Sequence, residues 1–233
     1  TGKKVKTFSI GMRGSTDLYY AKKVSEFLNT EHTELCLDEQ DFLDKIPEVI
    51  KHIETFDTTT VRASVGNYLV SKCIRNLTDC KVIFNGDGSD EVCGGYLYFH
   101  YAQNEYEFDL ECKRLLNNIH FFDVLRSDRT ISSNGLEART PFLDKNFVAS
   151  FLSIPAKIRY DTTKAYGEKY LLRKAFDDGN TLPKEVLWRT KEAFSDGVSS
   201  DKKSWFEVIK EYLDKKYPEY YDKVQCEGST IEK

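Results

Sequence analysis

The order of apolar patterns in the first half of the chain constrains the fold more than any other feature. Lys6–Ile10 and His32–Leu37 have the patterns of strands, and Lys81–Asn85 has that of a short buried strand. Helical periodicity follows the first strand over Asp17–Leu28, and two further helical stretches separate the second strand from the third. Strands that alternate with helices in this way predict an α/β fold with a parallel sheet and crossover helices.

The second half of the chain has a different pattern. After about Glu105 the strand patterns end, and apolar residues recur at helical spacing. We therefore predict one domain with two parts, an α/β sheet part over residues 1–104 and a mainly helical part over residues 105–233. The polar, charged tail after about Tyr217 is expected to fray.

Composition excludes several classes of protein. The 233 residues are 40% hydrophobic and 31% charged, which is typical of a soluble globular protein. The net charge of −4 argues against a nucleic-acid partner, and no apolar run is long enough for a membrane span. The six cysteines form no CxxC pair, so zinc spacing is absent, and without a secretion signal we predict reduced thiols in a cytoplasmic protein.

A glycine-rich acidic loop, Asn85–Glu91, directly follows the third predicted strand. It holds three carboxylates, Asp87, Asp90 and Glu91. Ligands of open parallel sheets bind beyond the carboxyl ends of the strands, and clustered carboxylates favour a cation such as Mg²⁺. Glycine and aspartate are also common in solvated turns, so these residues alone leave a metal- or phosphate-linked site and a turn as equal alternatives.

Five sequence blocks together resemble the glutamine-dependent asparagine synthetases. The segment "GDGSDEVCGGYLYFH" is similar to the acidic block of that family, and "HIETFDTTTVRAS", "SNGLEARTPFLDKNF", "EKYLLRKAF" and "KEAFSDGV" occur in the family's order. The resemblance implies a nucleotide alpha hydrolase fold of the Rossmann type. It also implies ATP- and Mg²⁺-dependent conversion of aspartate to asparagine through a β-aspartyl-AMP intermediate, which is attacked by ammonia derived from glutamine.

The resemblance also implies roles for individual residues. Asp90 matches the family's Mg²⁺ ligand, and Lys169 matches a lysine that stabilises phosphate charge. Asp87 stands where well-known members carry glutamate, which is proposed to take a proton from the attacking ammonium; aspartate is one methylene shorter. From spacing alone, Lys169 would be a solvated lysine on a helix surface.

Five further residues are candidates for ATP or substrate binding. By the same resemblance, Asn85 replaces a serine whose neighbourhood lines the family's nucleotide pocket, and Gly86, Gly88 and Ser89 follow it in the acidic block. Arg62 in "VRAS" is a candidate anchor for a substrate carboxylate, because guanidinium pairs bidentately with carboxylates. A structural ion pair is the alternative role for Arg62.

Other conspicuous residues are interpreted as structural. Arg139 is expected to tie a loop through several hydrogen bonds. Tyr96, Tyr98 and Phe99 are expected to pack in the core, and the stretch "MRGSTD" is interpreted as a helix cap.

Two parts of the family's pattern are absent from this sequence. The Ser-Gly-Gly-x-Asp-Ser loop that cradles pyrophosphate belongs just before "TGKKVKTFSI", with a first strand ahead of it, and the glutaminase domain has no counterpart. We expect a fragment, one half of a split gene, or a repurposed module, and we expect the chain alone not to form aspartyl-adenylate. The predicted partners are aspartate, ATP, ammonia and the missing N-terminal half; a homo-oligomer is left open.

Two other functions compete with the amidoligase. One is a non-catalytic nucleotide-binding or assembly module derived from a synthetase. The other is a β-lactam-forming relative on the same fold, which the full "YLYFH" and "SDGV" blocks disfavour.

Overall fold

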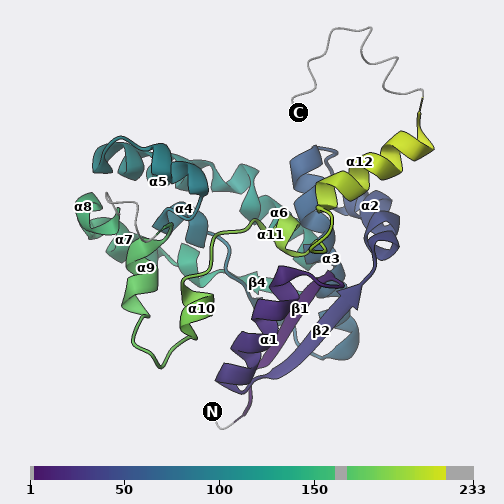
Figure 1. Ribbon diagram of the computed structural model, residues 1–233, viewed down its shortest axis with the longest axis horizontal. Coiled ribbons are helices and arrows are strands. Elements are labelled where there is room, and N and C mark those ends of the chain that lie inside the picture. The colour runs from purple at the N-terminus through teal and green to yellow at the C-terminus, as the bar shows by residue number, and fades with distance from the viewer. Residues whose placement is uncertain (1–2, 161–166, 219–233) are drawn as a thin grey trace, which may run out of the picture.

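Helices surround short parallel strands in the computed structural model, which describes residues 3–160 and 167–218 (Figure 1). Strands are marked β, α-helices α and 3₁₀ helices η. The elements in chain order are β1 (Lys6–Met12), α1 (Thr16–Leu28), β2 (Glu31–Leu37), α2 (Glu39–Ile53), α3 (Thr58–Leu77), β3 (Val82–Phe84), α4 (Ser89–Cys93), η1 (Leu97–Tyr101), α5 (Glu105–Asn118), η2 (Ile119–Phe121), α6 (Asp123–Ser132), β4 (Glu137–Arg139), η3 (Pro141–Leu143), α7 (Lys145–Ser153), α8 (Ala156–Arg159), α9 (Tyr170–Ala175), α10 (Lys184–Leu187), α11 (Phe194–Gly197) and α12 (Trp205–Lys216).

The first strand pair forms as the sequence predicts. β1 and β2 are parallel, with Lys6 opposite Glu31 and Met12 opposite Leu37, and α1 crosses between them. Leu18 N donates to Ser15 Oγ, so the prediction that "MRGSTD" caps a helix is confirmed.

The second strand pair is only partly predicted. β3 forms where expected and pairs in parallel with β4, Val82 opposite Glu137. The prediction that strands end after about Glu105 was therefore wrong. Glu-Ala-Arg has little strand preference of its own, so β4 owes its strand conformation to pairing with β3 rather than to a local pattern.

The described strands do not form the single parallel sheet that the sequence predicts. They form two separate two-stranded sheets, both parallel. The prediction that β3 is buried was also wrong, because Val82 is 43% exposed and Phe84 is 76% exposed. The physical reason is that side chains alternate along a strand, so that Ile83 packs in a hydrophobic cluster while Val82 and Phe84 lie on the other face.

The largest core cluster joins the first sheet to three helices. β1 contributes Ile10 and Met12, and α2, α3 and α12 supply most of the remaining side chains. Trp205 at the start of α12 is completely buried, with its ring edge-to-face against Phe42. Its Nε1 donates to Arg62 O at 3.1 Å. In Figure 1, α12 lies beside α2 and α3, as these contacts require.

Smaller clusters hold the helical part together, on the left in Figure 1. Phe108, Cys112 and Tyr160 are buried in one of them, so the prediction that Cys112 acts as a small hydrophobe is confirmed. Phe99 joins the same cluster, whereas Tyr98 is 42% exposed, so core packing is confirmed for Phe99 but was wrong for Tyr98.

No helix within the described residues is long and apolar enough to cross a bilayer. Thr1, Cys226 and the part of the predicted polar tail after Pro218 lie outside the described residues.

Trp205 should contribute strongly to stability. Trp205→Ala removes a fully buried side chain from the largest cluster, and we expect a loss of about 3–5 kcal/mol in the free energy of unfolding. Phe206→Ala, at the next and 43% exposed position, should cost about 1 kcal/mol or less. Urea unfolding followed by circular dichroism measures both, and equal losses would contradict this description of the core.

Candidate functional site

The acidic loop leaves the carboxyl end of β3 and turns directly into α4. Asn85 N donates to Arg139 O at 3.1 Å, which extends the pairing of β3 with β4 by one hydrogen bond. Gly88 has a φ of 84°, and a Cβ there would lie 2.3 Å from the side chain of Leu143. Both the backbone conformation and the lack of space therefore require glycine at position 88. Gly86 is different, because a Cβ there would meet nothing within 4 Å.

Asp90 lies between two lysines that come from distant parts of the chain. Lys191 Nζ donates to Asp90 Oδ2 at 2.8 Å. Lys169 Nζ lies 2.8 Å from Oδ1, although without the angle of a hydrogen bond. Burial raises the pKa of Asp90, but the two ammonium groups together outweigh burial and hold this pKa below its ordinary value. Asp90 is therefore a partly buried carboxylate that is ionised at neutral pH.

Lys169 is placed by the backbone around it. It precedes α9 with a φ of 56°, its N donates to Gly94 O at 3.2 Å, and its Nζ donates to Ser89 Oγ at 3.0 Å. A Cβ on Gly95 would lie 1.8 Å from Asp90 Oδ1 and 2.4 Å from Lys169 Cε. The Asp90–Lys169 contact thus depends on glycine at position 95.

Lys191 lies in the segment between α10 and α11, and neighbouring arginines hold this segment in place. Arg189 pairs with Asp17 at 3.2 Å and lies over the ring of Tyr20 at 4.4 Å. Arg173 on α9 donates to Arg189 O at 2.6 Å. These contacts fix the backbone two residues before Lys191.

Asp87 belongs to a different environment, although it is only three residues from Asp90. Asn85 Nδ2 donates both to Asp87 Oδ2 at 2.8 Å and to Ser127 Oγ on α6 at 2.7 Å. Burial raises the pKa of Asp87, and the nearby Asp123 carboxylate raises it further. Among the described residues no lysine pairs with Asp87.

The structure places Arg62 away from these contacts. It lies on α3, with its guanidinium over the ring of Phe206 at 5.8 Å, and its backbone oxygen accepts from Trp205. Arg62 Nε is buried without a hydrogen-bond partner in the described part of the chain. No recorded contact joins Arg62 to the acidic loop, so its role as a substrate anchor stays a prediction.

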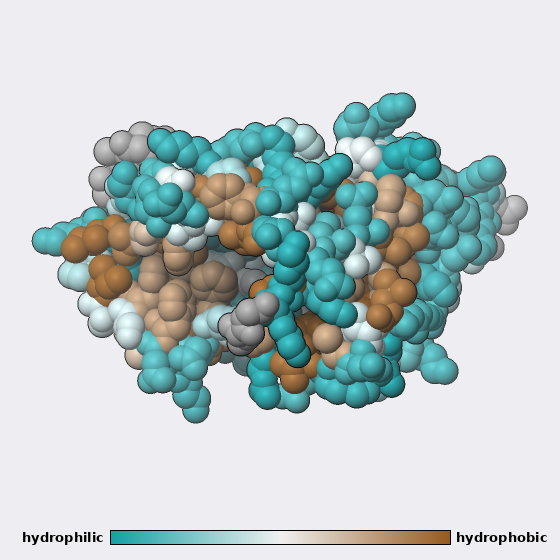
Figure 2. Space-filling view, turned by 90° about the horizontal axis from the view of Figure 1, so that it is seen from below, coloured by the Kyte–Doolittle hydropathy of each residue, from teal (hydrophilic) through white to brown (hydrophobic). Residues whose placement is uncertain are grey.

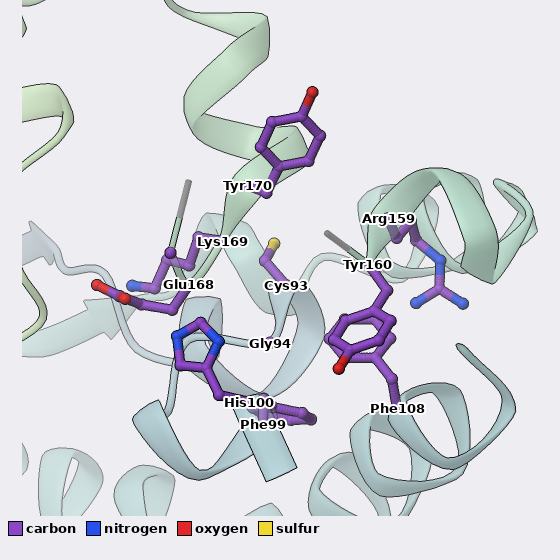
Figure 3. A pocket seen from close by; sticks show the side chains of 11 residues that line it. Cys93, Gly94, Phe99, His100, Phe108, Arg159, Tyr160, Glu168, Lys169 and Tyr170 are labelled. Carbon is purple, nitrogen blue, oxygen red and sulfur yellow. The ribbon is translucent and has the colours of Figure 1, made fainter. Parts of the chain in front are cut away.

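The pocket beside Lys169 is small. In Figure 3 the side chains of Glu168 and Lys169 lie together, on the opposite side of Cys93 from Phe108 and Arg159. The cavity volume is about 20 Å³, which is enough for a water molecule but not for a nucleotide. This cavity therefore does not hold a nucleotide by itself.

Sequence reasoning missed two features of the site. Lys191 is the first residue of the block "KEAFSDGV" but was not singled out, because its contact with Asp90 spans 101 positions. The second feature is a buried network, in which Tyr96 OH donates to Glu91 and, at 3.4 Å, to Asp123. Burial raises the pKa of Glu91, whose Oε2 has no partner among the described residues. Tyr96 was predicted as core packing only, and its aromatic spacing did not reveal this polar role.

The carboxylate of Asp90 suits Mg²⁺ as one ligand among several. Asp90 Oδ1 lacks a hydrogen-bond donor, and a single carboxylate together with substrate phosphates is a common way to hold Mg²⁺. No group of three or more His, Cys, Asp or Glu side chains in the described ranges could hold a metal by itself. Asp90 would therefore hold a cation only with ligands from elsewhere.

Comparison with known proteins decides the family. The family model described as asparagine synthase matches residues 1–113 and 102–227. The chain belongs to the asparagine synthase family. It is 51% identical over 210 residues to the glutamine-hydrolyzing asparagine synthetase of Gallus gallus and 49% identical over 210 residues to that of Homo sapiens. Each match covers 90% of this chain and 37% of the relative, so the chain spans less than two fifths of the length of these family members.

Replacing Asp90 and replacing Asp87 should change the free energy of unfolding in opposite directions. The pKa of Asp90 is lowered in the fold, so its ionised form adds stability that is present above about pH 4 and is lost as pH falls through the folded pKa. The pKa of Asp87 is raised, so its ionisation costs stability as pH rises through that value.

At pH 7 and with a metal chelator, Asp90→Asn should lower the free energy of unfolding by roughly 1–3 kcal/mol. Asp87→Asn should raise it under the same conditions, and both differences should shrink towards pH 4. Urea unfolding across this pH range measures them. If both substitutions changed the free energy of unfolding in the same direction at pH 7, that result would contradict the opposite pKa shifts of the two aspartates.

Proposed function

We propose that this chain is the part of a glutamine-hydrolysing asparagine synthetase that activates aspartate with ATP and transfers the activated group to ammonia. The observation that carries the proposal is the Asp90 carboxylate held between Lys169 and Lys191 immediately after β3. The relatives' names supply the reaction class, and their high identity supports extending it to this chain.

Asp90 and Lys169 would act on the phosphates of ATP. Asp90 would hold Mg²⁺, which supplies positive charge to the phosphate oxygens when bound. Lys169 would add a fixed cation near the same oxygens, because Ser89 Oγ accepts from its ammonium group and Gly94 O accepts from its backbone N.

Asp87 would take the proton from the attacking ammonium group. A raised pKa makes its carboxylate a better proton acceptor than an ordinary aspartate. Asn85 fixes one carboxylate oxygen by a hydrogen bond of 2.8 Å. The shorter reach of aspartate relative to glutamate would require ammonia to approach the acidic loop closely.

Substrate binding would involve the remaining candidates. Gly86, Gly88 and Ser89 provide backbone and hydroxyl groups at the carboxyl end of β3, where ligands of parallel sheets bind. The unpartnered Nε of Arg62 supports a role in binding a carboxylate. A cytoplasmic location, predicted from the cysteine pattern, is kept as part of this proposal.

We also infer that the two strand pairs belong to one parallel sheet of the nucleotide alpha hydrolase type, with a further strand between β1 and β3. One hydrophobic cluster contains Phe8 from β1, Ile83 from β3 and Ala138 from β4. Helices α3 and α6 lie side by side above it, α3 on β1 and α6 on β4. Neighbouring packed helices are about 8–10 Å apart, which is close to two strand spacings.

The two strand pairs also point the same way. Asp17 follows the carboxyl end of β1 and Asp90 follows that of β3. Lys191 donates to Asp90 and is close enough to act on the pKa of Asp17 as well. The carboxyl ends of β1 and β3 therefore lie on the same side, which supports a parallel arrangement.

A cavity lies where such a strand would fit. Its volume is about 370 Å³, and its walls include Phe8 and Ile10 of β1, Val24 of α1 and Val70 of α3. Helices line it on both sides, as expected for a buried parallel strand. Figure 2 shows apolar residues around a hollow near the middle of one face. The strand would come from a segment outside the described residues.

Complementation tests this function. The chain is combined with the part of the Gallus gallus relative that lies outside the match, and aspartate-dependent exchange of labelled pyrophosphate into ATP is measured. We expect exchange from the combination but not from the chain alone. Asp90→Asn and Lys169→Met should each reduce it at least about 100-fold, while Lys174→Met, on the exposed face of α9, should not.

The same experiment distinguishes the amidoligase from the competing function. A non-catalytic nucleotide-binding or assembly module would form a complex with the added part and show no aspartate-dependent exchange. Exchange that is unaffected by Asp90→Asn would contradict the proposed site while leaving the reaction class intact.

A further inference from the structure

Two lysines reach Asp90 from segments that are joined by an exposed loop. Lys169 precedes α9, and Lys191 follows α10. Figure 1 shows the loop between α9 and α10 projecting from the body of the molecule. In the described part of the chain, the recorded hydrogen bonds of residues 176–183 stay within this loop or reach the adjoining turns of α9 and α10. The loop's own hydrogen bonds therefore do not set the distance between the two segments.

Arg173 on α9 connects the two segments directly. Its Nη1 donates to Leu187 O at 2.9 Å and to Arg189 O at 2.6 Å. Its Nη2 donates to Glu168 Oε1 at 2.7 Å. Glu168 lies one position before the first lysine, and Arg189 lies two positions before the second. One guanidinium group therefore holds both segments, close to the lysine of each.

The bridge supplies donors to groups that need them. Leu187 is the last residue of α10, and the carbonyl oxygens in the last turn of a helix have no partner within the helix. The side chain of Glu168 is 5% exposed, and a buried carboxylate is unfavourable without a donor or a counter-ion. The side chain of Arg173 is 13% exposed, so water competes little for these hydrogen bonds. The bridge is therefore unlike a surface ion pair, which contributes little.

We propose that Arg173 is a positioning residue, which sets the placement of Lys169 and Lys191 around Asp90. The proposal rests on the proposed function for the reaction that this placement serves. The planar fork of a guanidinium group binds a carboxylate and backbone oxygens in fixed directions, whereas an ammonium group is a compact point charge on a flexible stem. Replacement of Arg173 by lysine therefore keeps the charge but loses part of the bridge.

A second anchor is the competing explanation for the placement of the lysines. Arg189 pairs with Asp17 at 3.2 Å and lies over the ring of Tyr20 at 4.4 Å. These contacts join the segment after α10 to α1 rather than to α9. If they were sufficient, loss of Arg173 would lower stability without moving either lysine.

Lysine reactivity separates the two explanations. Lysines of the wild-type chain and of Arg173→Lys are acetylated with a reactive ester and mapped by mass spectrometry. A positioning role predicts that acetylation of Lys169 and Lys191 rises about threefold or more, because each ammonium group spends more time away from Asp90. Acetylation of Lys174, at an exposed site on α9, should stay unchanged.

Arg159→Lys is the matched control. Arg159 is also a buried arginine, which donates to Ile154 O at 2.9 Å and pairs with Asp109. These contacts join α8 to α5 and to the end of α7, so this variant should leave the acetylation of both lysines unchanged. An equal rise in both variants, or no rise in Arg173→Lys, would overturn the proposal.

Glu168→Gln tests the same bridge if Arg173→Lys fails to fold. Glutamine keeps the size of the side chain and one acceptor oxygen, but it removes the charge that strengthens the contact with Arg173. We expect a smaller rise, of roughly twofold, in the acetylation of the same two lysines. Unchanged acetylation of both lysines in this variant would overturn the proposal.

Turnover of the complemented enzyme provides a third measurement. Arg173→Lys should lower kcat for aspartate-dependent pyrophosphate exchange about tenfold or more and leave KM for aspartate within about twofold, because a misplaced cation stabilises the transition state less. Arg159→Lys should keep the wild-type kcat. A wild-type kcat in Arg173→Lys would overturn the positioning role and leave the proposed function intact. Increased acetylation in Arg173→Lys, without exchange from the complemented wild-type enzyme, would support the bridge and reject the proposed function.

Discussion

The Asp90 carboxylate is the contact on which the rest of the site depends. It lies on α4 and receives Lys169 from the start of α9 and Lys191 from the segment before α11. Loss of this partly buried carboxylate would leave two lysine charges without a counter-ion, whereas loss of one lysine would leave the carboxylate paired with the other. Gly95 provides the space for this contact, since any side chain there would collide with Asp90 and Lys169.

The short acidic loop carries two aspartates whose pKa values are shifted in opposite directions. Burial acts on both carboxyl groups, but Lys169 and Lys191 hold the pKa of Asp90 below its ordinary value, whereas burial and the Asp123 carboxylate raise the pKa of Asp87. The separation follows from the change of direction at Gly88, whose positive φ turns the chain between the two aspartates. The proposed function, in which one carboxylate holds a cation and the other accepts a proton, needs this difference between neighbouring groups.

Local signals explain which parts of the fold could be predicted from the sequence. Three helices begin where a polar residue precedes apolar residues at helical spacing, and the residues that cap them are Ser15, Asp38 and Asp57. β4 could not be predicted, because its three residues become a strand only through contact with β3. The division of the described strands into two sheets also has no local signature, because the apolar pattern of a strand does not indicate which strand it pairs with.

The site itself was predictable only in part. The resemblance to a family indicated Asp90 and Lys169, and the structure brings these two together. Lys191 and the Glu91–Tyr96–Asp123 network escaped notice, because their partners are distant in sequence or belong to groups expected to pack as core. Long-range ion pairs leave no periodic pattern, so a folded structure was needed to find them.

A double-mutant cycle tests most directly whether Asp90 pairs with both lysines at once. Asp90→Asn is combined separately with Lys169→Met and with Lys191→Met, and the free energy of unfolding is measured for each single and double variant in the presence of a chelator. Simultaneous pairing predicts a coupling energy above about 0.5 kcal/mol for each lysine. Additive effects, within about 0.3 kcal/mol, for either lysine would contradict the three-group contact on which the site is built.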